Sequence, residues 1–382
     1  MLTVIILPMR NLKPYILFCL ISFYPIYLAS SPSNILNNIL LPDGFKIEVF
    51  AEDLIGPRQM TEGSNGEIYI GSRKSGKVVL IQDRDKNGKT DYKRIIAENL
   101  NQPSGVSFYN GDLFIAEIDK IWKISNIYSW LSENSTGLPE LELVTDNLPD
   151  DEWHGWKWMK HDSAGRIYVN VGASCNVCIK DDDRYATILR INSSSYEIIA
   201  RGVRNSVGFD WHPVTEELFF TDNGRDWLGD ETPPCELNRV QNYGAFYGFP
   251  YRHGTNIVDP EYGSAKHGYE LVPPVYEFQA HSAPTGLAFY DKDMFPEEYE
   301  NAAFITLHGS WNRSSKVGYK VVAAKFDKGG NLEILHDFMT GFLDGENTIG
   351  RPAAPFILSD GSLLVSDDFQ NLIYRVTFNQ TD

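Results

Sequence analysis

The 382-residue sequence is short of basic residues: 34 Lys and Arg stand against 51 Asp and Glu, which gives a formal net charge of -17. A protein that binds nucleic acid needs a basic face, so this composition disfavours that class of partner. Long helical periodicity is also lacking, which argues against an α/β fold. The sequence is instead 42% hydrophobic and 13% aromatic, a composition that supports a packed fold and not a disordered chain.

Long apolar runs are absent apart from one near the N-terminus, YILFCLISFYPIYLA (15–29), which follows two basic residues and ends in small ones. This run is shorter than the roughly 20 residues that a membrane helix needs. The pattern predicts a signal peptide over residues 1–31, with Met9 as an alternative start, and a periplasmic or secreted domain without a membrane span over residues 32–382. An uncleaved anchor is the alternative.

Cysteine is scarce, with four residues in the chain. Cys19 falls in the predicted signal peptide, and Cys175 and Cys178 form CNVC. No His follows Cys178, so the pair is not a haem attachment site, and the second pair that a zinc site needs is absent. We therefore expect a local disulfide, which suits an oxidising compartment, with a reduced structural pair as the alternative. Cys235 is left unpaired.

A short phrase recurs along the chain: a turn with Gly or Asp, then a short apolar and aromatic run. The copies are SNGEIYIGS (64–72), YNGDLFIAE (109–117), SAGRIYVNV (163–171), VTEELFFTD (214–222), YENAAFITL (299–307) and SDGSLLVSD (359–367). Most copies are flanked by further alternating segments, so each unit is a small meander of strands. Six such units predict an all-β fold, a six-bladed β-propeller of four-stranded antiparallel blades.

Two segments lie outside the regular repeat. The strand FKIEVFA (45–51) precedes the first copy, and we expect it to close the ring by pairing with the last blade, because closure removes exposed strand edges. A long excursion rich in Gly, Pro and Tyr, roughly 226–284, separates the fourth and fifth copies, and loops of that length are usually functional.

Polar clusters fall on the loops that a propeller gathers over its central channel: DEWHGWKW, RGVRNSVG, TDNGRDWLGDE, HSAPTG, HGSWNRS and GRPAAP. The side chains of interest in these clusters are those of His154, Arg204, Asn205, Asn223, Arg225, Arg313 and Arg351. Four arginines over one channel would repel one another without an anion, even in a protein this acidic. The carboxylates of a cofactor would supply that anion.

His154 lies between tryptophans in DEWHGWKWM (151–159). A buried histidine that only packs against aromatic rings is commoner than a catalytic one. The residues alone therefore leave both interpretations open.

Several phrases together resemble one family: RGVRNSVGFDWHP, TDNGRDWLGDE, HGSWNR, and GRP followed by LSDGSLLVSDD. They look like the soluble glucose/sorbosone dehydrogenases, six-bladed propellers that bind pyrroloquinoline quinone (PQQ) and calcium. The resemblance spans Leu41 to Phe378 and is closest to the sorbosone, or aldose sugar, branch. It implies a quinoprotein sugar dehydrogenase.

The resemblance also implies roles for individual residues. The family's catalytic His matches His154, and its Arg-Asn pair that contacts PQQ matches Arg204 and Asn205. The Arg that opens the last blade and binds a PQQ carboxylate matches Arg351.

The family's calcium is bound by PQQ and by two successive backbone carbonyls after a polar residue. These match Gly224 and Arg225, which follow Asn223, itself an expected cofactor contact. The basic residue of blade five is best matched by Arg313, with Lys316 as a rival.

The resemblance implies two further cofactor contacts, at Arg58 and Thr285. The chain also departs from the family pattern. Ala173 replaces an acidic residue of the glucose-oxidising branch, Ala353 replaces a second Arg in the last blade, and Cys235 stands where the sorbosone branch often has an acid. These departures concern the substrate and the set of carboxylate contacts.

The implied reaction is oxidation of an aldose or a related sugar to a lactone or acid, with electrons passed on to an external acceptor. His154 would take the proton from O1, and the calcium-polarised quinone would take the hydride from C1. Trp153, Trp156 and Trp227 are candidate stacking surfaces for the sugar or the quinone, or ordinary packing residues. The alternatives are a calcium-dependent lactonase-type propeller and a non-catalytic carbohydrate-binding propeller.

The loop DRDKNGKTD (83–91) has the oxygen spacing of an EF-hand-like calcium loop, with candidate ligands Asp83, Asp85, Asn87 and Asp91. Arg94 stands where the bidentate Glu belongs, so we expect weak affinity at this second calcium site. A plain polar hairpin turn is the alternative.

Overall fold

The structure is a computed structural model that describes residues 35–132, 136–192 and 195–379, all within the unit Ser31–Asp382. The predicted signal peptide over residues 1–31 lies outside the described residues. Among the residues that are described, no helix is long and apolar enough to cross a membrane.

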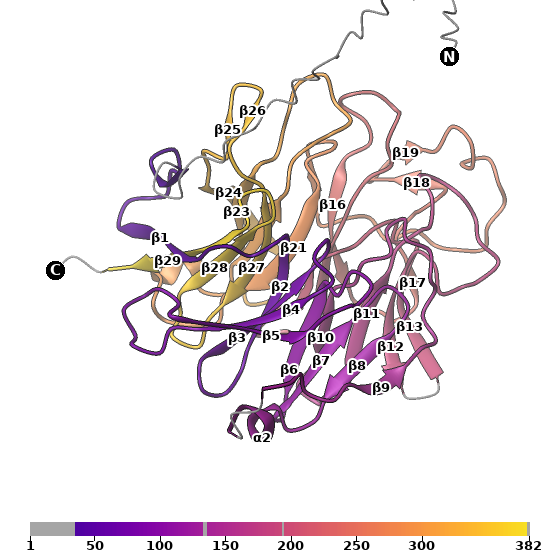
Figure 1. Ribbon diagram of the computed structural model, residues 1–382. Helices are drawn as coiled ribbons and strands as arrows, with labels where there is room; N and C mark the ends of the chain where they lie inside the picture. The colour runs from indigo at the N-terminus through magenta and orange to yellow at the C-terminus, as the bar shows by residue number, and fades with distance from the viewer. Residues whose placement is uncertain (1–34, 133–135, 193–194, 380–382) are drawn as a thin grey trace, which may run out of the picture. The chain divides into compact units, whose positions relative to one another are not determined.

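Six sheets of antiparallel strands follow one another along the chain (Figure 1). Blade 1 has β2 (Pro57–Glu62), β3 (Glu67–Ser72), β4 (Val78–Gln82) and β5 (Tyr92–Ala97). Blade 2 has β6 (Gly105–Tyr109), β7 (Asp112–Ala116), β8 (Ile121–Ile124) and β9 (Glu142–Thr145), with α2 (Ile127–Ser132) before β9. Blade 3 has β10 (Met159–His161), β11 (Ile167–Val171), β12 (Thr187–Asn192) and β13 (Ser195–Arg201).

The remaining blades have the same plan. Blade 4 has β14 (Phe209–Trp211), β15 (Leu218–Asp222), β16 (Cys235–Val240) and β20 (Tyr276–Phe278). Blade 5 has β21 (Pro284–Phe289), β22 (Ala303–Leu307), β23 (Lys320–Phe326) and β24 (Leu332–Met339), with the 3₁₀ helix η1 (Glu297–Tyr299) before β22. Blade 6 has β27 (Pro352–Ile357), β28 (Leu363–Asp367), β29 (Leu372–Phe378) and β1 (Phe45–Ala51). The predicted six-bladed propeller is confirmed.

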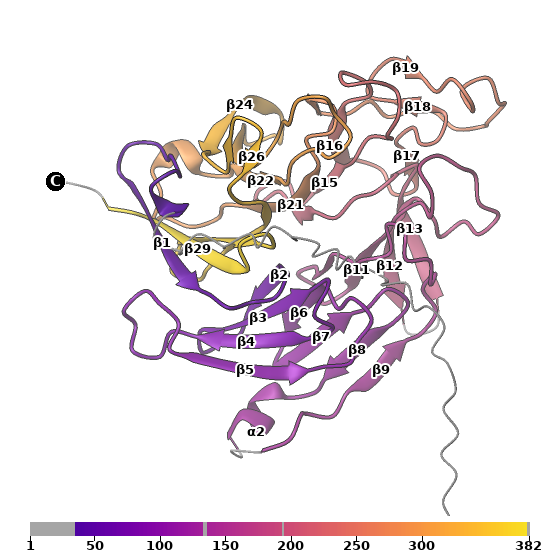
Figure 2. The same cartoon turned by 45° about the horizontal axis from the view of Figure 1, so that its top comes forward.

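The ring closes where the first and last strands of the chain meet. β1 pairs antiparallel with β29, and Phe45 lies opposite Phe378. Figure 2 shows the two strands side by side at the junction of the indigo and yellow parts of the chain. This confirms the expected closure, which covers the edge that β29 would otherwise expose.

The recurring phrase of the sequence is the second strand of each blade, and its register explains the packing. The middle residues of the six copies are Tyr69, Phe114, Tyr168, Phe219, Phe304 and Leu364. Each of them packs in the apolar cluster shared with the next blade around the ring, while its chain neighbours pack in the cluster shared with the blade before. Because side chains alternate across a strand, one short apolar run fills two interfaces.

Residues 226–284, which the sequence predicts as a long excursion, contain several strands. Its LNRV and YEF segments form β16 and β20 of blade 4. A short strand, β17 (Ala245–Phe246), adds parallel to β13, and β18 (Arg252–His253) pairs with β19 (Ile257–Val258). A second hairpin, β25 (Leu343–Asp344) with β26 (Asn347–Thr348), precedes blade 6.

Candidate active site

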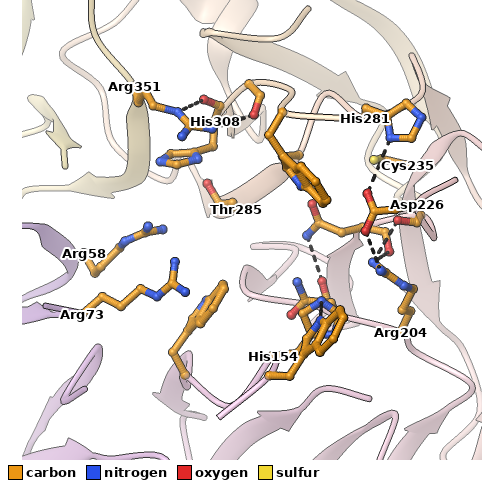
Figure 3. Close-up of a pocket in the computed structure, with 18 of the residues that line it drawn as sticks. Arg58, Arg73, His154, Arg204, Asp226, Cys235, His281, Thr285, His308 and Arg351 are labelled. Atoms are coloured by element: carbon orange, nitrogen blue, oxygen red, sulfur yellow. Dashed lines mark hydrogen bonds and ion pairs between the residues drawn. The ribbon is translucent and has the colours of Figure 1, made fainter. Parts of the chain in front are cut away.

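A cavity of about 440 Å³ opens at the end of the propeller where the first strands of the blades begin and the second strands end. Figure 3 shows how side chains from several blades point into it. The residues that line it and enter the argument are Arg58, Arg73, Trp153, His154, Trp156, Arg204, Asn205, Asn223, Gly224, Asp226, His281, Thr285, His308, Gly309, Trp311 and Arg351.

His154 lies in the loop between β9 and β10, buried against the end of β11. Its Nδ1 is 2.7 Å from the carbonyl oxygen of Ala173, and its Nε2 is 3.1 Å from Nε1 of Trp153. A Cβ on Gly172 would lie 2.6 Å from the Cβ of His154, so only glycine leaves room for the ring here. The backbone of His154 has a φ of 58°, in the left-handed region. The imidazole is therefore held closely from one side.

The chemistry of these contacts defines the state of the ring. A carbonyl only accepts hydrogen bonds, so Nδ1 of His154 carries the proton and Nε2 has a free electron pair. Burial, followed by the positive charge of Arg204, lowers the pKa of His154 to about 3. The ring is then neutral at ordinary pH, the state that a general base requires.

Arg58, Arg73 and Arg351 form one side of the cavity, called here the arginine side (Figure 3). Nη2 of Arg58 is 2.5 Å from Asp368, which is also 2.8 Å from Nε2 of His308. Arg351 donates to the carbonyl oxygen of Gly309 at 2.7 Å. Although burial raises the pKa of Asp368, Arg58 and His308 hold it well below its usual range, so this carboxyl is ionised.

Arg73 has no ion pair among the described residues. Its guanidinium lies over the ring of Trp156, 3.7 Å from the centroid. Burial, followed by the positive charge of Arg58, lowers the pKa of Arg73 to about 10. Of the three guanidiniums on the arginine side, that of Arg58 alone has an ion pair with a carboxylate among the described residues, and an anion in the cavity would relieve their repulsion.

The opposite side of the cavity, called here the base side, carries His154, Arg204, Asp226 and His281. Arg204 is buried, and its Nη2 is 3.1 Å from Asp226, whose other carboxylate oxygen is 3.8 Å from Nδ1 of His281. The nearby carboxylate of Asp226 raises the pKa of His281. Cations and anions are therefore paired on this side.

A buried carboxylate positions the Arg-Asn pair. Asp222 accepts hydrogen bonds from the backbone N–H groups of Arg204, at 2.8 Å, and Asn205, at 2.7 Å. The side-chain oxygen of Asn205 is buried and has no hydrogen-bond partner, and Nε of Arg58 is in the same condition. Buried polar groups without partners are unusual, and both of these residues line the cavity.

Three other predicted cofactor contacts also reach the cavity. Asn223 donates to the carbonyl oxygen of Asn205 at 2.9 Å, and Thr285 donates to the carbonyl oxygen of Ala353 at 2.9 Å. Arg351 lies on the arginine side. The structure thus brings together these residues with the other predicted contacts at His154, Arg58, Arg204, Asn205 and Gly224.

Arg313 is not among the residues that line the cavity, and its assignment to the cofactor stays a prediction. Its guanidinium bonds the carbonyl oxygen of Asp230 and the carboxylate of Glu231, both on the excursion, and it does not line the cavity. The rival Lys316 binds the carbonyl oxygen of Glu346 at 2.7 Å. Arg313 is therefore held by a carboxylate and a backbone carbonyl, and Lys316 by a backbone carbonyl and the hydroxyl of Thr348.

The predicted calcium position fits poorly in this arrangement. The carbonyl oxygen of Gly224 accepts a hydrogen bond from Nη1 of Arg204 at 2.9 Å, so a guanidinium already occupies one of the two expected oxygen ligands. The side chain of Arg225 points elsewhere, into a buried pair with Asp259 at 2.5 Å. Within the described ranges, no group of three or more His, Cys, Asp or Glu side chains is placed to hold a metal ion.

The acidic loop of blade 1 is held by its own backbone. Asp83 accepts from the N–H groups of Asn87, at 3.1 Å, and Gly88, at 2.8 Å, and Asp91 accepts from the N–H of Arg84 at 2.9 Å. These bonds are those of a polar turn. The second calcium site at Asp83, Asp85, Asn87 and Asp91 stays a prediction.

The loop after β11 carries a disulfide between Cys175 and Cys178, whose Cα atoms are 6.2 Å apart. Between them, Asn176 accepts from Arg204 at 2.8 Å through its carbonyl oxygen. The small disulfide ring therefore braces a direct neighbour of the base side. Cys235 is free and buried beside the cavity.

Sequence reasoning missed Arg73, His308 and Asp368. All three lie one residue after the second strand of a blade, as does Asn223, which was found. Aligning the residue that follows each copy of the recurring phrase would have identified them. Trp311 was also missed as a cavity residue; it pairs with Trp227, which does not itself line the cavity.

Comparisons with known proteins agree with this description. The family model described as TrAA12-like matches residues 261–341, and that of a domain of unknown function, DUF7133, matches residues 31–128. A calcium structure of a Trichoderma reesei enzyme of carbohydrate-active family AA12 covers 89% of this chain and 97% of its own, with a TM-score of 0.73 and 18% identity.

Two PQQ-containing structures are similar too. The holo PQQ domain of pyranose dehydrogenase from Coprinopsis cinerea has a TM-score of 0.71 and 16% identity, covering 89% of this chain and 97% of its own. The PQQ-bound aldose sugar dehydrogenase of Streptomyces coelicolor has a TM-score of 0.61 and 14% identity, covering 89% of this chain and 100% of its own. The chain thus has the six-bladed fold of the soluble PQQ-dependent sugar dehydrogenases.

One relative is much nearer in sequence. An uncharacterized protein of Borreliella burgdorferi is 36% identical over 379 residues, which cover 93% of this chain and 96% of the relative. The chain belongs to the same family as that protein.

Proposed function

We propose that this protein is a PQQ-dependent sugar dehydrogenase, which oxidises the anomeric C–H and O–H of an aldose or a related sugar to a lactone. The observation that carries the proposal is the division of one cavity between a neutral imidazole, unprotonated at Nε2, and three guanidiniums of which one is paired with a carboxylate. The fold shared with PQQ-bound sugar dehydrogenases supports the same conclusion.

The residues present fit PQQ, a planar quinone with three carboxylates. Arg58, Arg73 and Arg351 would bind its carboxylates, since guanidinium and carboxylate groups pair in charge and in planar geometry. The unpartnered side-chain atoms of Arg58 and Asn205 would then gain partners. When bound, PQQ supplies an electrophilic quinone carbon that accepts a hydride.

The chain's own part in the reaction is proton transfer and orientation. His154 would remove the proton from O1 of the sugar at Nε2, while the carbonyl oxygen of Ala173 holds Nδ1–H and fixes the tautomer. Trp153 and Trp311 line the cavity and would limit the access of water.

Calcium has no step in this proposal. It would need the carbonyl oxygens of Gly224 and Arg225, and Arg204 would have to release the first of these. We retain calcium as an expected cofactor whose remaining ligands come from PQQ.

The lactonase alternative needs a metal held by side-chain carboxylates, whereas the residues that line the cavity include four arginines and two carboxylates, those of Glu152 and Asp226. The carbohydrate-binding alternative explains the tryptophans and leaves the arginine side without a partner.

The deciding experiment adds PQQ to the purified protein, with and without calcium, and follows quinone absorbance and dye reduction with a panel of aldoses. Retained PQQ and sugar-dependent dye reduction support the proposal. Sugar binding without dye reduction would favour the binding protein, and hydrolysis of lactones without dye reduction would favour the lactonase.

Electrons would pass from the reduced cofactor to an external acceptor, for which the dye substitutes in the assay. The disulfide is consistent with export to the periplasm or beyond the cell.

A further inference from the structure

The electron pair of His154 is already engaged. Nε1 of Trp153 donates a hydrogen bond to Nε2 of His154 at 3.1 Å, and the two rings meet edge to face with their centroids 6.0 Å apart. Any sugar hydroxyl that gives its proton to Nε2 must first replace this indole N–H. The two donors compete for one acceptor, because a neutral imidazole has a single free electron pair.

The two partners are held very differently. His154 is 8% exposed, and the carbonyl oxygen of Ala173 and the close approach of Gly172 hold it in place. Trp153, by contrast, is 56% exposed. The acceptor is therefore fixed, and the donor is free to turn away into solvent.

We propose that Trp153 is a displaceable cap on His154 and a determinant of substrate specificity. In the free protein its indole N–H satisfies Nε2, and only a ligand that presents a hydroxyl donor at that point replaces it. The proposal rests on the assignment of His154 as the base. It predicts that the site selects sugars with a free anomeric hydroxyl over ethers and free aldehydes, which bring no donor to Nε2.

The hydrogen bond from Trp153 affects both the free site and the binding of a ligand. Without it, the buried electron pair of Nε2 would lack a partner whenever the site holds no sugar, which is unfavourable for a buried polar atom. With it, a ligand gains only the difference between its own hydrogen bond and that of the indole. A ligand without a donor loses the whole bond, which is how an unpaired polar group produces specificity.

The first test needs neither sugar nor PQQ. Diethyl pyrocarbonate acylates the free nitrogen of neutral imidazoles, and peptide mass spectrometry measures the rate at His154 separately from the other histidines. Trp153→Phe keeps an aromatic ring and removes the N–H, so acylation of His154 should become about 2- to 10-fold faster, the range expected for one neutral hydrogen bond.

Trp311→Phe is the matched control, because Trp311 lines the same cavity, is 67% exposed and, among the described residues, has its ring contact with Trp227 and no hydrogen bond to His154. It should leave the rate at His154 unchanged. Equal rates in wild type and Trp153→Phe would overturn the proposal. So would equal acceleration by both variants, since that result would attribute the effect to general opening of the cavity.

The second test uses tryptophan fluorescence of the wild-type protein without cofactor. An aldose with a free anomeric hydroxyl should change the emission, and Trp153→Phe should abolish most of that change. The 1-O-methyl glycoside of the same sugar should change it at least tenfold less at equal concentration. Equal responses to the sugar and its methyl glycoside would contradict the cap. Faster acylation in Trp153→Phe together with no oxidation of any aldose by PQQ-loaded protein would retain the cap and reject the proposed function.

Discussion

The two sides of the cavity differ in how their charges are balanced. On the base side, Arg204 is paired with Asp226, and the carbonyl oxygen of Ala173 and the indole N–H of Trp153 bond the two ring nitrogens of His154. On the arginine side, Asp368 is the one carboxylate paired with a guanidinium among the described residues, and Arg73 has no ion pair. A balanced, well-bonded surface keeps a reactive group in one state, whereas an unbalanced surface binds a ligand of opposite charge. The comparison therefore assigns proton transfer to the base side and binding of the cofactor carboxylates to the arginine side.

The largest expected effect falls on the base side. His154→Ala should lower kcat about 10²- to 10⁴-fold, because general-base assistance is lost, and should leave PQQ binding intact. His161→Ala is the control: His161 lies on β10, bonds Ser107 at 2.8 Å and does not line the cavity. Steady-state dye reduction by PQQ-loaded protein measures both. Near wild-type turnover in His154→Ala would show that His154 is a packing residue and not the general base.

A smaller effect, on binding alone, is expected from the arginine side. Arg351→Lys should weaken PQQ binding about tenfold, or ~1.4 kcal/mol, because Lys keeps the charge and loses the planar pair of donors. Arg73→Lys should act similarly. Arg313→Lys is the matched control and should not change the affinity, which titration of quinone absorbance measures. A loss of PQQ affinity in Arg313→Lys alone would instead assign the carboxylate contact to Arg313, as the family resemblance implies.

The pH dependence sharpens the contrast further. A base works when unprotonated, so its contribution falls as pH drops through its pKa. Because the pKa of His154 is lowered to about 3, kcat/KM should show no loss due to this group between about pH 5 and 8. An acid limb centred near 6.5, absent from His154→Gln at its reduced rate, would show that the ring is less buried during the reaction than in this structure.

The smallest effect is expected far from both sides. Asp83→Ala should remove two hydrogen bonds to backbone amides of the turn and destabilise the protein by about 1 kcal/mol. Calorimetry with calcium, on this variant beside wild type, tests the predicted second site. A lower calcium stoichiometry in Asp83→Ala would support that site.

The architecture was open to prediction from the sequence because each second strand is buried on both faces. A run such as EIYIGS has to fill two interfaces, so its apolar pattern is strong and repeats once per blade. His154, Arg204 and Arg351 were also within reach, since they stand in recognisable phrases.

The partners of those residues were not predictable in the same way. Asp368 meets Arg58 across the junction of the last and first blades, and Arg204 meets Asp226 across two loops. Nothing local in the chain encodes these pairs, because the curvature of the ring brings them together. Arg313 is the opposite case. Its phrase matches the family and predicts a cofactor contact, whereas its guanidinium pairs with Glu231 on the excursion.

The pairing of β1 with β29 also bears on how the molecule is made. The outermost strand of the last blade is β1, the first strand of the described residues, so blade 6 stays incomplete until residues close to the C-terminus have been synthesised. Until then β28 has no partner for its outer edge, and β1 has none at all. Contacts between residues this distant in sequence form slowly, since the chain must close a very large loop. The unclosed ring is the stage at which this protein is most open to strand exchange with a second copy, and a chain that lost β1 would remain at that stage permanently.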